Sequence, residues 1–134
     1  MGRIAGWESR LARTIEVHHA LPMAYGSSDC FLLAADSVEA VTGVRIFADS
    51  RRYRTEPGAA RCLRRKGFAT LADAFGSLFE PISVARAGRG DIGVVVRDGV
   101  LVAGVFTAQG FLARGETMLV AVPRSNIQTA WRVG

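Results

Sequence analysis

The segment from about Ser28 to Thr42 is apolar on most of its surface, and a helix of that kind has to be buried on several sides. Ser27 or Ser28 suits its N-cap, Asp29 suits its first turn, and Gly43 fits just past its C-terminus. The apolar side chains are Phe31, Leu32, Leu33, Ala34, Ala35, Val38 and Val41. We therefore expect this segment to be the central core helix of a domain.

Three further helices are expected in the first sixty per cent of the chain. Their approximate ranges are residues 5–17, 56–66 and 70–78. Apolar residues four apart predict the first, Pro57 suits the first turn of the second, and Thr70 with Asp73 has the spacing of a capping box. Pro22 interrupts regular structure ahead of the core helix.

After Pro81 the pattern changes to short β-type runs separated by turn residues. The expected strands are residues 82–86, 92–97, 100–107, 111–114 and 117–122. Asp98-Gly99 between two apolar runs is a strong hairpin signal. A short helix capped at Ser125 is expected in the tail, where it would seat Trp131 on the core. Helices followed by an antiparallel meander indicate an α+β fold, here as one domain over residues 1–134.

The composition is that of an ordinary globular protein, with 49% hydrophobic and 22% charged residues among 134. No apolar run approaches the roughly 20 residues that cross a bilayer, and no signal-peptide core is visible, so we expect synthesis in the cytoplasm. No cofactor is expected. Cys30 and Cys62 lack a CxxC spacing, and the adjacent His18 and His19 cannot both face one metal ion from a regular helix.

The net charge of +5 has a local origin: seven of the seventeen basic residues lie between residues 51 and 66. They are Arg51, Arg52, Arg54, Arg61, Arg64, Arg65 and Lys66. This density suits an acidic partner surface or a phosphate, although a solvated helix face would look the same. No aromatic residues interleave as a stacking platform, so nucleic-acid binding is not favoured as the main function.

Cys30 stands at the start of the core helix, where a thiol has the setting of a nucleophile. Unpaired N–H groups and the helix macrodipole stabilise a thiolate there and lower its pKa. A nucleophile also needs a base, however, and cysteine is also often a small buried hydrophobe. Both interpretations of Cys30 stay open at this point.

Two motifs resemble those of the NlpC-type branch of the papain-like cell-wall cysteine peptidases. Tyr25-Gly26-Ser27-Ser28-Asp29-Cys30 resembles the family's nucleophile motif, in which an aromatic residue and a glycine precede Asp-Cys. Arg89-Gly90-Asp91-Ile92-Gly93-Val94-Val95 resembles its strand entry, although one intervening residue is missing. Val102-Ala103-Gly104-Val105-Phe106 matches the next strand, His-(Val/Ala)-Gly-(Ile/Val)-Tyr, except at the first place. The resemblance implies a papain-like α+β fold.

More closely, nearly the whole chain resembles a group of small phage and prophage proteins of that superfamily. The match is carried by Trp7 and Leu11, Leu21-Pro22-Met23-Ala24-Tyr25-Gly26, Asp29-Cys30, Ala34-Ala35-Asp36, Thr42-Gly43, Gly90-Asp91 and Ala130-Trp131-Arg132-Val133. The resemblance implies a place among phage tail proteins, near a tail tip that cuts or contacts the bacterial wall. It implies localisation in the virion, with tail-tip or hub proteins, and in some cases peptidoglycan, as partners.

The departure from the family concerns its base. Val102 stands where the family has its catalytic histidine, and the third polar residue falls near Ala113 or Arg114. Phe31 replaces the usual serine after the cysteine, which indicates an apolar site. His18 or His19 is an alternative base if the fold brings the first helix to Cys30. Asp29 and Asp91 are expected to make local structural bonds.

We therefore expect a structural or binding component of a phage-type tail tip, built on a degenerate NlpC-like peptidase fold. The alternative is an active cysteine peptidase or amidase that cleaves peptidoglycan stem peptides with Cys30 as nucleophile. A third hypothesis is a basic adaptor for nucleic acid or another polyanion.

Overall fold

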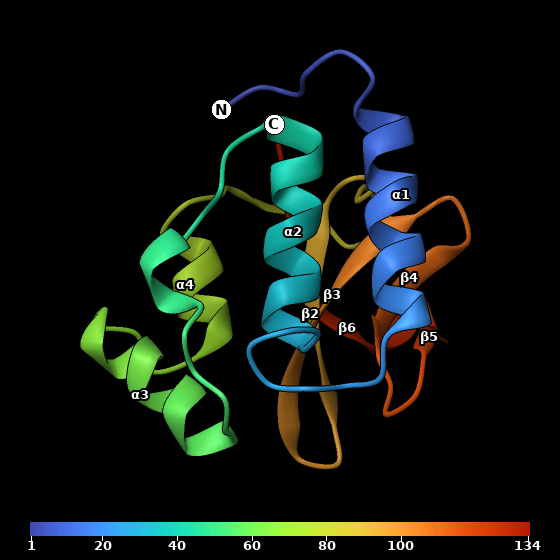
Figure 1. Ribbon diagram of the computed structural model, residues 1–134. Helices are drawn as coiled ribbons and strands as arrows, with labels where there is room; N and C mark the ends of the chain where they lie inside the picture. The colour runs from blue at the N-terminus through green and yellow to red at the C-terminus, as the bar shows by residue number, and fades with distance from the viewer.

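Helices α1 and α2 lie side by side over one face of a six-stranded antiparallel sheet in the computed structural model, which describes residues 1–134 (Figure 1). The helices are α1 (Trp7–Ala20), α2 (Cys30–Thr42), α3 (Glu56–Arg65) and α4 (Leu71–Gly76), with short 3-10 turns η1 (Ala48–Ser50) and η2 (Arg124–Asn126). The strands are β1 (Pro81–Ile82), β2 (Ile92–Arg97), β3 (Val100–Thr107), β4 (Gly110–Arg114), β5 (Leu119–Val122) and β6 (Ile127–Trp131). The α+β class and the four helices predicted ahead of Pro81 are confirmed.

The sheet order is β1-β6-β2-β3-β4-β5, so only β2 to β5 form the predicted meander. The tail prediction was wrong. Its 3-10 turn is followed by β6, which returns between β1 and β2 and places Trp131 in the core as a strand residue. The expected strand at residues 82–86 shortens to β1, because the chain turns at Ser83, whose carbonyl accepts bonds from Arg86 and Ala87.

The β2–β3 hairpin forms as predicted around Asp98-Gly99. Arg97 pairs with Val100, and the two turn residues have φ values of 51° and 76°. Positive φ at both central positions is the geometry of a type I′ turn, whose twist matches that of the strands. Local turn chemistry therefore sets the register of these two strands.

Side chains alternate between two apolar clusters on opposite faces of the sheet. Val94, Ala103 and Val105 belong to the main cluster, which includes the buried face of α2. Val95 and Phe106, their direct neighbours in the chain, belong to a second, smaller cluster. This alternation fixes which strand residues face α2 and Cys30.

The two ends of the chain meet at Asp91 through hydrogen bonds from Arg3 and Val133. The labels N and C lie close together in Figure 1. The guanidinium of Arg3 donates to Asp91 Oδ1, to the Arg89 carbonyl and to the Val133 carbonyl, and Asp91 Oδ1 also accepts from Val133 N. Asp91 Oδ2 accepts locally from Gly88 N. The predicted local role of Asp91 is confirmed, and the chain ends add a long-range one.

Candidate functional site

Asp29 caps α2, and the turn before it is built around that carboxylate. Its oxygens accept from Leu32 N, Gly26 N and the Tyr53 hydroxyl, at 2.8, 3.0 and 2.7 Å. The expectation of a serine cap was therefore wrong, because Asp29 has the extended backbone of an N-cap and reaches two chain segments at once. Gly26 has φ of 83° and lies so close to Tyr53 that a Cβ would overlap the Tyr53 carbonyl oxygen.

Cys30 is the first residue of α2, as predicted, but its surroundings disfavour a thiolate. The residue is half-buried, packs against the main apolar cluster and lines none of the four main pockets. Burial raises the pKa of the Cys30 thiol and the negative charge of Asp29 raises it further, while a hydrogen bond with the backbone of Ala103 opposes both effects. Of the two interpretations of Cys30, this environment favours the buried thiol, because loss of water raises the pKa more than the backbone hydrogen bonds lower it.

The position of the missing base also needs correction. Val102 packs against the second apolar cluster, on the face of the sheet that points away from α2. The β3 side chains on the α2 face are Leu101, Ala103 and Val105. None of them can accept a proton, so the face opposite Cys30 lacks a base for a different reason than the one inferred from the motif.

His18 does come close to the start of α2, but both of its ring nitrogens are occupied. Nδ1 lies 2.8 Å from Ser28 Oγ, and Nε2 lies 2.8 Å from Asp36 Oδ2. The histidine is only 2% exposed, and Ser28 is fully buried. His18 therefore holds α1, the turn before α2 and the middle of α2 together, and offers Cys30 no free nitrogen.

Arg114 and Arg51 complete this buried network from either side. Arg114 Nη1 donates to Ser28 Oγ at 2.7 Å and to the His18 carbonyl at 2.5 Å, and Arg51 Nη1 donates to Asp36 Oδ1 at 2.6 Å. With a neutral His18, Arg114 donates to Ser28, Ser28 donates to His18 and His18 donates to Asp36, which also accepts from Arg51 on its other oxygen. We call these five residues the His18 network.

The His18 network was missed by the sequence analysis. The sequence marks Arg114 only as a possible place of the family's third polar residue, and Ser28 only as a candidate helix cap. Its members come from α1, α2, β4 and two loops, so no local spacing marks them. The single available signal was His18, a polar residue followed by a second histidine at the end of an amphipathic helix. His19, the other alternative base, is exposed and lines a groove between α1 and the β3–β4 hairpin.

The arginine cluster divides in two in the structure. The Arg51 side chain is mostly buried against Asp36, with 11% exposed. The other predicted partner-binding residues are exposed: Arg52, Arg54, Arg61, Arg64 and Arg65. Lys66 pairs with Asp49 at 2.6 Å. The basic surface therefore centres on α3 rather than on the whole 51–66 segment.

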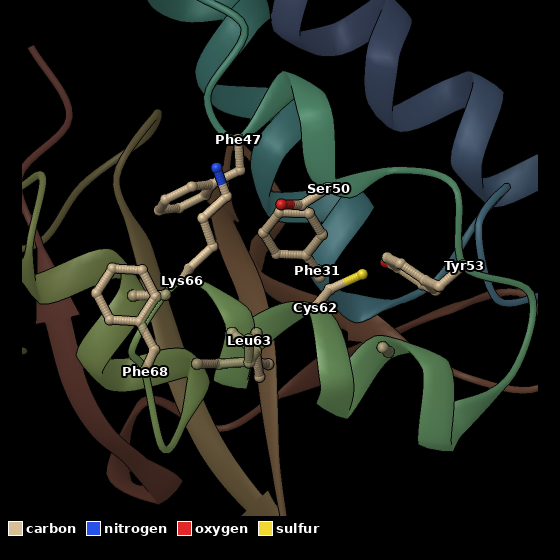
Figure 2. Close-up of a pocket in the computed structure, with 11 residues that line it drawn as sticks. Phe31, Phe47, Ser50, Tyr53, Cys62, Leu63, Lys66 and Phe68 are labelled. Atoms are coloured by element: carbon tan, nitrogen blue, oxygen red, sulfur yellow. The ribbon is translucent and has the colours of Figure 1, made fainter.

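An apolar pocket lies beside that surface, between α3, α4 and the start of α2 (Figure 2). Its empty volume is about 380 Å³, including space open to solvent, and nine of its eleven lining residues are hydrophobic. We call it the α3 pocket; its walls include Phe31, Phe47, Cys62, Leu63 and Phe68, with Lys66 also lining it. Cys62 is half-buried in this pocket.

No group of three or more His, Cys, Asp or Glu side chains is arranged to hold a metal ion. None of the helices has the length and apolar character needed to span a membrane.

A family model described as a domain of unknown function, DUF6950, matches residues 2–133. No curated protein and no solved structure matches the chain.

Proposed function

Because the chain belongs to the DUF6950 family, whose function is unknown, we propose from its site that it is a structural or binding component of a phage-type tail tip, built on a degenerate NlpC-like, papain-like fold. The observation that carries the proposal is the environment of Cys30. The β3 face opposite the thiol is apolar, and the nearby His18 has both nitrogens bonded. A thiol without a base does not carry out the family's acyl transfer.

The sequence motifs support the ancestry in this proposal, and the structure supports the loss of activity. Tyr25, Gly26, Asp29, Gly90 and Asp91 all have structural roles that need no substrate. Tyr25 packs half-buried against the main cluster, and Gly90 has φ of 97° against Arg3 and Trp7. The motif residues that remain are therefore those that hold the fold together. In this proposal the protein and its partner chains lie in the virion tail.

The test is hydrolysis of isolated peptidoglycan and of synthetic stem peptides, with wild type beside Cys30→Ala. We expect no product from either protein. Release of product by wild type that Cys30→Ala abolishes would overturn the proposal and establish the active peptidase or amidase instead. The second half of the test is detection of the chain in purified tails of a phage that encodes it.

A further inference from the structure

We propose that the α3 pocket is the docking site of an acidic protein segment that inserts one apolar side chain between α3 and α2. This inference rests on the binding role proposed above and specifies its surface and its partner's chemistry. Three independent observations carry it: helix α3 is incompletely covered, the pocket beside it is open and aromatic, and the exposed charges around the pocket are mainly positive.

Helix α3 is the least covered element of the fold. None of its residues is fully buried, and its apolar side chains Ala59, Cys62 and Leu63 are only half-buried, although they face the pocket. In Figure 1 it lies at the periphery, apart from the sheet. A helix whose apolar face is left half-covered has area to gain from a further apolar group.

The pocket is preformed by aromatic rings rather than by a mobile loop. Phe47 lies with its ring centroid 6.1 Å from that of Phe31 and 5.9 Å from that of Phe68. Its φ of 49° is an uncommon conformation for a bulky residue, and the contacts of its ring hold it there. Figure 2 shows the rings of Phe31, Phe47 and Phe68 around the opening, with Lys66 beside them. Such a pocket presents apolar and aromatic walls to a leucine or aromatic anchor.

The charge around the pocket selects an acidic partner. Arg61, Arg64 and Arg65 are exposed on α3, next to exposed Arg52 and Arg54. Residues 49–66 contain only two acidic residues, Asp49 and Glu56, and Asp49 is already paired with Lys66. A second copy of this chain that docks through the same face would bring arginines against arginines, and a polyanion such as DNA would use the charge but leave the apolar pocket empty.

The experiment measures fluorescence anisotropy with a fluorescein-labelled peptide in which a central Phe-Leu pair is flanked by runs of Glu and Asp. A second peptide carries Gly-Ser in place of Phe-Leu. We expect wild type to bind the first about tenfold or more tightly than the second, since burying one apolar side chain contributes that much.

Two variants separate the pocket from the charge. Ala59→Trp fills the pocket and should remove the preference for Phe-Leu while leaving weak binding of both peptides. The triple variant Arg61→Glu, Arg64→Glu, Arg65→Glu should lose both. The matched control reverses three exposed arginines elsewhere, Arg13→Glu, Arg97→Glu and Arg132→Glu, and should keep the preference. Thermal melting checks that each variant folds.

Absence of peptide binding by wild type, equal binding of both peptides, or equal losses in the two triple variants would overturn the inference. So would binding of a DNA duplex that Ala59→Trp leaves unchanged, which identifies a polyanion site, or a dimer that Ala59→Trp dissociates. These outcomes leave the tail-tip proposal standing as long as peptidoglycan stays intact. Hydrolysis dependent on Cys30 would instead remove the proposed function whatever the peptides do.

Discussion

The Nε2 atom of His18, on α1, lies 2.8 Å from Oδ2 of Asp36, on α2. This bond joins the two helices that lie over the sheet, and it sits inside a network that also ties the turn before Cys30 to β4 through Ser28 and Arg114. The histidine nearest the cysteine is thereby used for structure.

Replacing His18 with alanine should destabilise the fold by about 2–4 kcal/mol, because the buried Ser28 and the half-buried Asp36 each lose a partner. Urea denaturation followed by circular dichroism measures the loss. His19→Ala is the control, since that exposed neighbour should change stability by no more than about 0.5 kcal/mol. Equal effects of the two substitutions would contradict the structural role of the network.

Asp36 should make the protein sensitive to acid. Burial alone raises its pKa, but the hydrogen bonds from His18 and Arg51 prevail and hold the pKa of the carboxyl below its usual value of 3.8. A lowered pKa in the folded state stabilises the protein above the unfolded pKa, and the contribution is lost as the pH falls through the folded pKa. Melting temperatures between pH 7 and about pH 3 should therefore fall less steeply in Asp36→Asn than in wild type, from a lower starting value. A parallel pH dependence in both proteins would rule this out.

Cys30 should react slowly with iodoacetamide at neutral pH, since burial raises the pKa of its thiol. The rate should climb only in base, and it should rise at neutral pH once urea unfolds the chain. Cys62→Ser isolates the Cys30 signal, and mass spectrometry of the peptide that contains Cys30 quantifies it. Rapid alkylation of the folded protein at pH 6 would show the activated thiol that this environment argues against.

Gly26 and Gly67 form a matched pair for testing the turn before Cys30. Both have positive φ, 83° and 88°, but only Gly26 would place a Cβ against the Tyr53 carbonyl oxygen, whereas the space around Gly67 is empty. Gly67→Ala should cost about 1–2 kcal/mol from conformation alone. Gly26→Ala should cost clearly more, with a correspondingly lower melting temperature, because Tyr53 must move and weaken its bond to Asp29. Equal losses of stability in the two variants would show that the turn before α2 accommodates the added Cβ without displacing Tyr53.

The features that could be predicted from sequence are those encoded locally. The core helix, the capping box at Thr70 and the Asp98-Gly99 hairpin each depend on residues a few positions apart, and all three are present. Strand β6 was mistaken for a helix because its partners, β1 and β2, come much earlier in the chain. Nothing in the short β6 segment itself specifies this pairing.

The candidate site likewise has features that are encoded locally and features that depend on distant parts of the chain. The position of Cys30 at a helix start follows from the local pattern, and so does the absence of a histidine from β3. The motif could not reveal which face of β3 Val102 occupies, because a strand places alternate residues on opposite sides and only packing against α2 settles the parity. The His18 network is non-local in every bond, so only the folded chain shows it.

The insertion of β6 between β1 and β2 has a consequence for the order of folding. Strands β2 to β5 can pair with one another through short hairpins, but β1 has no neighbour until Ile127–Trp131 arrives. Bringing Ile127–Trp131 back to β1 and β2 closes a long loop, and such closure is slow compared with formation of a hairpin. Until it happens, β2 presents an open edge and Trp131 leaves an unfilled space beside Phe75, whose ring centroid lies 5.8 Å away in the finished core. The half-built sheet is thus the state in which this chain is most exposed to aggregation and proteolysis.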